Sequence, residues 1–117
     1  MTRRAAFGLR ANRHVAGAFE WYEQQRAGLG SEFLSAVDEA IELLQQMPEL
    51  GHVVHRDLRR LSLRRFPYVI YYRITGSSVR IRACLHERRD ARVRETHPSY
   101  TAATLRSRPM AQTERRC

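Results

Sequence analysis

The chain has 117 residues, of which 43% are hydrophobic, enough for one small domain with a single core. All 21 basic residues are arginine, against 12 acidic residues, and the net charge is +9. Two cysteines, Cys84 and Cys117, provide neither a disulfide framework nor a CxxC zinc pair, which suits a reducing cytosol. The apolar N-terminal run breaks at Arg10 and is too short for a signal peptide or a membrane span.

The charges are unevenly distributed along the chain. Every charged residue from 31 to 50 is acidic, whereas arginine dominates from 56 to 90. We therefore expect one acidic and one basic face, and the basic face favours nucleic acid or an acidic protein as partner. Arginine binds phosphate and carboxylate bidentately. Codon usage in a GC-rich genome is another reason for arginine in place of lysine, but it does not explain the excess of positive charge.

A short strand is predicted over residues 5–10, followed by a hairpin of two helices. Asn12 is expected to cap the first helix, because its side-chain oxygen can accept from the free N–H groups there. Gly28 and Gly30 are expected to end this helix, as left-handed residues commonly do. The apolar positions follow the i, i+3, i+4, i+7 spacing of one helix face: Val15, Ala18, Phe19 and Tyr22.

The second helix is predicted to be capped by Ser31, with Glu32 near its positive end, and to stop at Pro48. Because the glycine-containing turn is short, the two helices should form an antiparallel hairpin. The apolar stripe of this helix consists of Leu34, Val37, Ile41 and Leu44, widened by Phe33, Ala40 and Met47.

Three strands are predicted after a loop over residues 49–56. They cover residues 58–66, 68–74 and 79–86, and Pro67 precedes the middle strand because it has no N–H for a ladder. The last strand should alternate between its two faces: Val79, Ile81, Ala83 and Leu85 on one, and Arg80, Arg82, Cys84 and His86 on the other.

The order β-α-α-β-β-β predicts an α+β fold, with the helical hairpin packed on one face of a twisted, mostly antiparallel sheet. The domain is expected to cover residues 1–95. Residues 96–117 are poor in large apolar side chains and are predicted to form a basic, disordered tail. The predicted strand core consists of Leu61, Leu63, Ile70, Ile81 and Leu85.

Three segments together resemble the RelE/ParE toxin superfamily, on its ParE-like side. Residues 21–33, WYEQQRAGLGSEF, look like the junction between the first two helices of that family. Residues 64–73, RRFPYVIYYR, look like its central strand, and residues 85–90, LHERRD, like the end of its last strand. The order and spacing match over about residues 4–94.

This resemblance implies the β-α-α-β-β-β fold and the toxin half of a type II toxin–antitoxin pair. The Phe66-Pro67-Tyr68 form is similar to the branch whose members poison DNA gyrase, whereas the nuclease branch places an arginine where this chain has Tyr68. The implied partners are DNA gyrase and a cognate acidic antitoxin, ParD-like or similar. Neither a cofactor, a metal nor a membrane is expected.

Two alternatives stay open. The first is a metal-independent, ribosome-dependent mRNA endonuclease of the RelE type. Cutting RNA requires a base, an acid and cations at one phosphate, and the matching residues are Arg64, Arg65, Tyr68, Arg82, His86 and Arg88. The second is a degenerate, non-toxic member that acts only as a binding module.

Two binding surfaces are predicted. The target is expected to meet the arginine-rich margin of the sheet, namely Arg64, Arg65, Arg82, His86, Arg88 and Arg89. The antitoxin is expected in the groove between hairpin and sheet, on Phe19, Trp21, Tyr22, Arg59 and Arg60.

Further candidates carry less weight. Cys84 and His86 share a strand face, but no third group orients a Cys–His pair. His52, His55 and Asp57 match no standard zinc spacing. Of the adjacent Tyr71 and Tyr72, one is expected in the core and the other on the surface.

Overall fold

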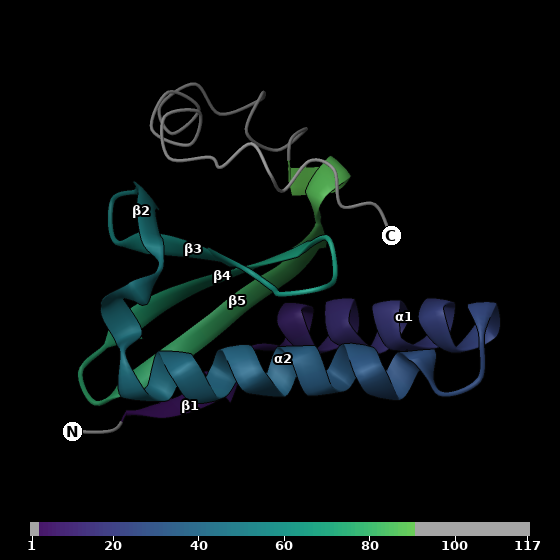
Figure 1. Ribbon diagram of the computed structural model, residues 1–117. Coiled ribbons are helices and arrows are strands. Elements are labelled where there is room, and N and C mark those ends of the chain that lie inside the picture. Colours follow the sequence, from purple (N-terminus) through teal and green to yellow (C-terminus); the bar gives the residue numbers. More distant parts are fainter. Residues whose placement is uncertain (1–2, 91–117) are drawn as a thin grey trace.

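The computed structural model describes residues 3–90, shown in colour in Figure 1. The predicted tail over residues 96–117, with Cys117, lies outside the described residues, so the domain boundary stays a prediction. The elements are β1 (Arg4–Phe7), α1 (Leu9–Gln25), α2 (Leu29–Gln46), the 3-10 turn η1 (Pro48–Leu50), β2 (His52–His55), β3 (Leu58–Ser62), β4 (Tyr68–Thr75) and β5 (Ser78–His86). None of the described helices is long and apolar enough to cross a membrane.

The five strands form one sheet in the order β1-β5-β4-β3-β2, with α1 and α2 as a hairpin on one face (Figure 1). β1 runs parallel to β5, and the other three pairs are antiparallel. The predicted α+β class and layering are confirmed. The prediction of a loop over residues 49–56 was wrong, because residues 52–55 form an edge strand that pairs with β3. The strand expected over residues 58–66 ends at Ser62, and Arg65, with a φ of 73°, lies in the turn that leads to β4.

Both predicted helix caps were wrong. α1 already begins at Leu9, and the amide of Asn12 donates to the carbonyl of Gly8 inside the helix. α2 begins at Leu29, directly after Gly28, whose left-handed φ of 91° agrees with the prediction for that glycine. The cap comes from the preceding helix, because the carboxylate of Glu23 accepts from the amides of Gly28 and Gly30 at 2.9 Å each.

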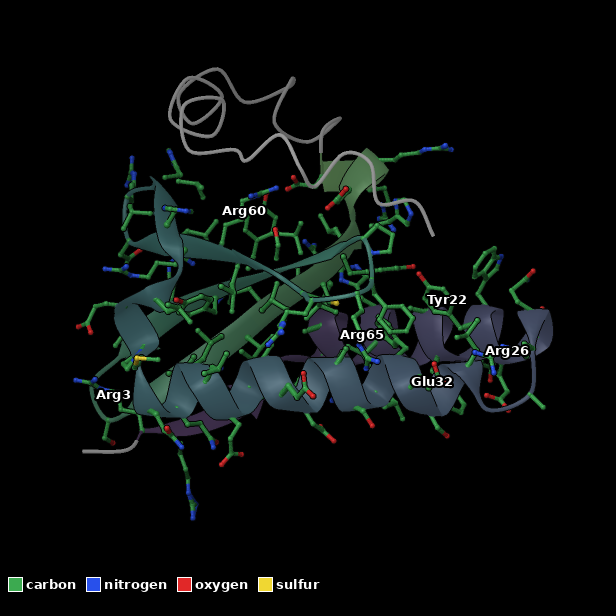
Figure 2. The ribbon with its side chains drawn as sticks, in the orientation of Figure 1. Arg3, Tyr22, Arg26, Glu32, Arg60 and Arg65 are labelled. Carbon is green, nitrogen blue, oxygen red and sulfur yellow. The ribbon has the colours of Figure 1, made fainter. Side chains whose placement is uncertain are left out.

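Gly30 does not end α1 but lies inside α2, where the hairpin needs a residue without a side chain. A Cβ there would lie 2.7 Å from the Phe19 ring. Arg26 and Glu32 meet on the surface near the same turn at 3.3 Å (Figure 2). At this turn, Gly30 and the Glu23 carboxylate therefore allow the two helices to approach closely.

The buried face of α2 is rotated relative to the predicted stripe. Leu34 and Met47 are 36% and 49% exposed, so they lie outside the core. The fully or nearly buried positions share the side that faces the sheet: Phe33, Ala36, Val37, Ala40 and Leu44. On α1, Ala18 and Tyr22 are buried while Val15 and Phe19 are half-buried, which agrees with the predicted face.

A bulge divides β5 into two halves. Tyr72 pairs with Ile81 and Tyr71 with Ala83, so Arg82 is an extra residue in the ladder. One extra residue exchanges the faces of all residues beyond it. The predicted alternation therefore holds only up to Arg82: Val79 and Ile81 face the helices together with Cys84, whereas Ala83 and Leu85 face the opposite side.

The sheet is consequently buried on both faces. Tyr72 belongs to the cluster beneath the helices and Tyr71 to the second cluster, so the prediction that one of them is on the surface was wrong. The hydroxyl of Tyr72 donates to the Pro48 carbonyl at 2.7 Å and accepts from the Gly51 amide at 2.8 Å. Four of the five predicted strand-core residues, Leu63, Ile70, Ile81 and Leu85, are buried, and Leu61 is partly buried.

Candidate binding surfaces

A buried ion pair fixes the segment that follows β5. Residues 87–90 form a helical turn at the end of β5, on the side of the sheet away from the hairpin (green in Figure 1). There Arg60 Nη2 donates to Asp90 Oδ2 at 2.8 Å, and the Tyr71 hydroxyl donates to Asp90 Oδ1. Arg60 is only 3% exposed and Asp90 1% (Arg60 is labelled in Figure 2). The pair holds the helical turn in place and leaves Arg88 and Arg89 exposed on it.

The first hollow, which we name the α1–β5 groove, lies between α1 and the ends of β4 and β5. Its volume is about 320 Å³. The rings of Tyr68 and His86 meet edge to face with centroids 5.2 Å apart, and the indole of Trp21 is 53% exposed. The side chains that line it combine aromatic rings with cations: Arg13, His14, Trp21, Tyr68, His86 and Arg89.

Hydrogen bonds to the two imidazoles of this groove select one tautomer of each neutral ring. β1 pairs with β5 only from Ser78 to Ile81, so among residues 3–90 no strand pairs with the outer edge of β5 at Cys84. There the Cys84 amide donates to His14 Nδ1 at 3.1 Å. The Arg88 amide likewise donates to His86 Nδ1 at 3.0 Å. A nitrogen that accepts carries no proton, so each neutral ring has its N–H at Nε2.

Burial and nearby arginines favour these neutral forms. The pKa of His14 is lowered by burial and then by the charges of Arg89 and Arg10. The pKa of His86 is lowered by burial and then by Arg88. Burial raises the pKa of the Cys84 thiol to about 12. Cys84 is therefore a protonated core thiol at neutral pH, which does not fit a nucleophile paired with His86.

The second hollow, the open-face hollow, lies on the sheet face opposite the hairpin and measures about 760 Å³. Its floor consists of Leu58, Tyr71, Ala83 and Leu85. Five arginines surround it: Arg10, Arg73, Arg80, Arg82 and Arg89. Arg73 is paired with Asp57 at 2.7 Å, and within residues 3–90 the other four form no ion pair.

The third hollow, the α2–β3 groove, has the opposite electrostatic character. It measures about 670 Å³ and is lined by apolar side chains, among them Leu43 and Leu61. Its rim is acidic except for Arg64, since α2 contributes Asp38, Glu39 and Glu42. The predicted acidic face is therefore present along α2.

The structure brings together only some of the residues predicted for the target surface and the nuclease site. Tyr68, His86 and Arg89 share the α1–β5 groove, and Arg82 and Arg89 share the open-face hollow. Arg64 lines the α2–β3 groove instead. Arg65 is exposed in the β3–β4 turn, 6.0 Å from the Phe66 ring, and Arg88 is exposed beyond β5.

The residues predicted for the antitoxin surface differ in accessibility. Trp21 is exposed and Phe19 half-buried, but Tyr22 and Arg60 are 3% exposed. Arg59 donates to the carbonyls of Glu49 and Gly51, at 3.1 and 2.8 Å.

Sequence reasoning missed the contribution of α1 to the two basic hollows, namely Arg10, Arg13 and His14, and on β5 it did not single out Arg80. On α1 a signal was present, because Arg10, His14, Gly17 and Trp21 recur at the spacing of one helix face beside the apolar one. Among the described residues, no group of three His, Cys, Asp or Glu side chains could hold a metal ion.

A helical hairpin on one face of a mostly antiparallel sheet, with arginine-rich hollows at its margins, defines a small basic protein of the α+β class. The chain belongs to the family described as ParE toxin of type II toxin-antitoxin system, parDE, whose model matches residues 6–91. No curated protein sequence matches it. A solved structure described as a chromosomal ParDE TA system from P. aeruginosa has the same fold, with a TM-score of 0.56 and 16% identity, over 73% of this chain and 96% of that chain.

Proposed function

We propose that this member of the ParE toxin family arrests bacterial growth by binding DNA gyrase and is neutralised by a cognate antitoxin. One observation carries the proposal. Arg88 and Arg89 are exposed on a helical turn that the buried Arg60–Asp90 pair connects to the sheet. A positioned pair of guanidinium groups suits the recognition of an acidic protein surface and requires no assembled catalytic set.

The positions of the other arginines support inhibition by binding over catalysis. Cleavage of RNA needs a base, an acid and cations at the same phosphate. Tyr68, His86 and Arg89 are adjacent, but Arg64 and Arg82 line two other hollows. The endonuclease is therefore the second candidate, favoured by the Tyr68–His86 contact alone.

We propose the α1–β5 groove as the main antitoxin site. The α2–β3 groove, which also separates hairpin from sheet, has an acidic rim that repels an acidic segment. In the α1–β5 groove, exposed Trp21 offers an apolar anchor, while Arg13 and Arg89 can bind carboxylates. An antitoxin bound there also covers Arg89, so neutralisation follows from occupying the target surface. Affinity should fall steeply with added salt, because charge pairs at the rim are screened.

The test is a double variant, Arg88→Ala with Arg89→Ala. It should abolish growth arrest and the accumulation of cleaved plasmid DNA by purified gyrase, with little loss of stability, because both side chains are exposed. Arg4→Ala with Arg26→Ala is the matched control, since it removes the same charge from exposed positions elsewhere. A double variant that stays as toxic as the control would contradict the proposal. Codon-positioned mRNA cuts without gyrase-dependent DNA cleavage would establish the endonuclease instead.

A further inference from the structure

The open-face hollow concentrates positive charge that the described residues do not neutralise. Arg10 comes from the first turn of α1, Arg80 and Arg82 from β5, and Arg89 from the helical turn after β5. All four are exposed. Three separate elements thus contribute arginine side chains to one concave surface. Within the described part of the chain no acidic residue lines this hollow, and Asp57, which lies near it through Arg73, is already bound to that arginine. Mutual repulsion makes such a cluster unfavourable unless an anion binds there.

The start of α1 adds to this positive potential. Gly8 caps the helix without a side chain, and the first turn contains no acidic residue. The first bond of the helix ladder is donated by Asn12, so the amides before it have no acceptor within the helix. The positive end of the helix dipole therefore lies at the same hollow, since Gly8, Leu9 and Arg10 line it.

The floor of the hollow indicates which kind of anion fits. Tyr71, Ala83 and Leu85 are only 5%, 9% and 7% exposed, so the floor has little apolar surface left to bury. Of the residues that line the hollow, Leu9 is the one large apolar side chain that is mostly exposed, at 68%. An amphipathic acidic peptide would gain little from its apolar anchors, because that gain scales with the area removed from water. A volume of about 760 Å³ ringed by four cations also exceeds the needs of one phosphate ion. A chain of phosphates fits both properties.

We propose that the open-face hollow binds the backbone phosphates of a nucleic acid, through Arg10, Arg80, Arg82 and Arg89, without reading its base sequence. The inference rests on the proposed function in one respect: DNA held by gyrase is the polyanion that a gyrase-binding toxin meets. The toxin would then contact both the enzyme and the DNA of one complex. No bond is made or broken in this step.

Direct binding is the test, with the full chain and no gyrase. The fluorescence anisotropy of labelled duplex DNA, single-stranded DNA and single-stranded RNA of mixed sequence is measured against toxin concentration at several salt concentrations. About four neutralised phosphates predict a slope of log affinity against log salt of about −3.6 for duplex DNA, and about −2.8 for single strands. The three arms show which source of phosphates the hollow prefers.

Two variants with equal charge locate the site. Arg80→Glu with Arg82→Glu should weaken duplex binding by more than about tenfold and reduce the slope by about 2, because two phosphate contacts are lost. Arg4→Glu with Arg64→Glu changes the net charge equally outside the hollow and should weaken binding less than about threefold. A double variant that only neutralises the two charges, Arg80→Gln with Arg82→Gln, should also weaken duplex binding, but by less than the charge-reversed variant. Urea denaturation verifies that each variant is folded.

Equal losses in the two charge-reversed variants would overturn the proposal, because bulk charge alone would then explain binding. Absence of binding to all three nucleic acids would overturn it as well. Gyrase-dependent cleavage of plasmid DNA is scored separately. If gyrase-dependent cleavage persists while direct binding to nucleic acid is absent, the proposed function is supported and the phosphate site is refuted. If direct binding is present while gyrase is unaffected, the phosphate site is supported and the proposed function is refuted.

Discussion

Removal of the Asp90 carboxylate is the most informative test of how this domain is held together. Asp90→Ala leaves the guanidinium of Arg60, which is 3% exposed, without its 2.8 Å partner, and also removes the carboxylate to which the Tyr71 hydroxyl donates. Leaving one partner of a buried pair uncompensated costs about 3–5 kcal/mol. Domains of this size are stable by about 5–15 kcal/mol, so the variant should lie near the limit of folding.

Urea denaturation followed by tryptophan fluorescence measures the loss, since the chain has a single Trp. The urea concentration at the midpoint of unfolding should fall strongly, with little change in the dependence of the unfolding free energy on urea concentration. The matched control is Asp57→Ala, which breaks an ion pair of 2.7 Å whose carboxylate is 71% exposed and should therefore cost far less than the loss of the buried pair. A second variant, Arg60→Met with Asp90→Leu, removes both charges together and should recover most of the loss. If Asp90→Ala costs no more than Asp57→Ala, the pair is not buried in solution and the account of the turn carrying Arg88 and Arg89 is refuted.

Two further predictions concern the core and pH. Ile81→Ala should lower the free energy of unfolding by about 2–5 kcal/mol, because Ile81 is fully buried beneath the helices. Ile74 packs against the same cluster but is only partly buried, so Ile74→Ala should cost less in the same urea titration; equal losses would contradict this difference in burial. The lowered pKa values of His14 and His86 mean that the unfolded chain binds more protons below its ordinary histidine value of 6.5. Stability should therefore be complete above about pH 6.5 and decline as the pH falls below it. Urea titrations between pH 5 and 8 measure the free energy of unfolding at each pH. His14→Asn, whose amide oxygen can still accept from the Cys84 amide, should reduce the dependence of this free energy on pH. An unchanged dependence would show that His14 does not contribute to it.

The order of elements could be predicted because each depends on local patterns, such as the helical spacing before the glycine turn or Pro67 before a strand. The bulge at Arg82 could not, because the alternation of Val79, Arg80, Ile81 and Arg82 gives no sign of an inserted residue. Its only trace is the run of three apolar residues 83–85, all buried, which a strand with one solvated face would not contain.

Interactions between distant residues account for the other misses. The cap of α2 was assigned to Ser31 because that residue type caps helices in its own turn, yet Glu23 of the preceding helix supplies the acceptor. Arg60 was predicted to belong to the antitoxin surface, where an arginine could contact an acidic partner, and arginine is rarely buried without a partner of its own. Its partner Asp90 lies 30 residues further along the chain, and no local pattern connects them.

The bulge and the buried pair together explain how a sheet buried on both faces can still present a basic surface. The bulge brings Ala83 and Leu85 to the side of the sheet that already carries Arg80 and Arg82, so exposed arginines surround a floor that is already packed. An apolar pair in place of Arg60 and Asp90 could stabilise that floor equally well. Apolar contacts lack direction, however, whereas the 2.8 Å bond from Arg60 and the Tyr71 hydroxyl bond fix the Asp90 carboxylate in one orientation. Because Asp90 belongs to the turn that carries Arg88 and Arg89, this polar core specifies where the exposed charges lie, and so links the packing of the second sheet face to the proposed binding surfaces.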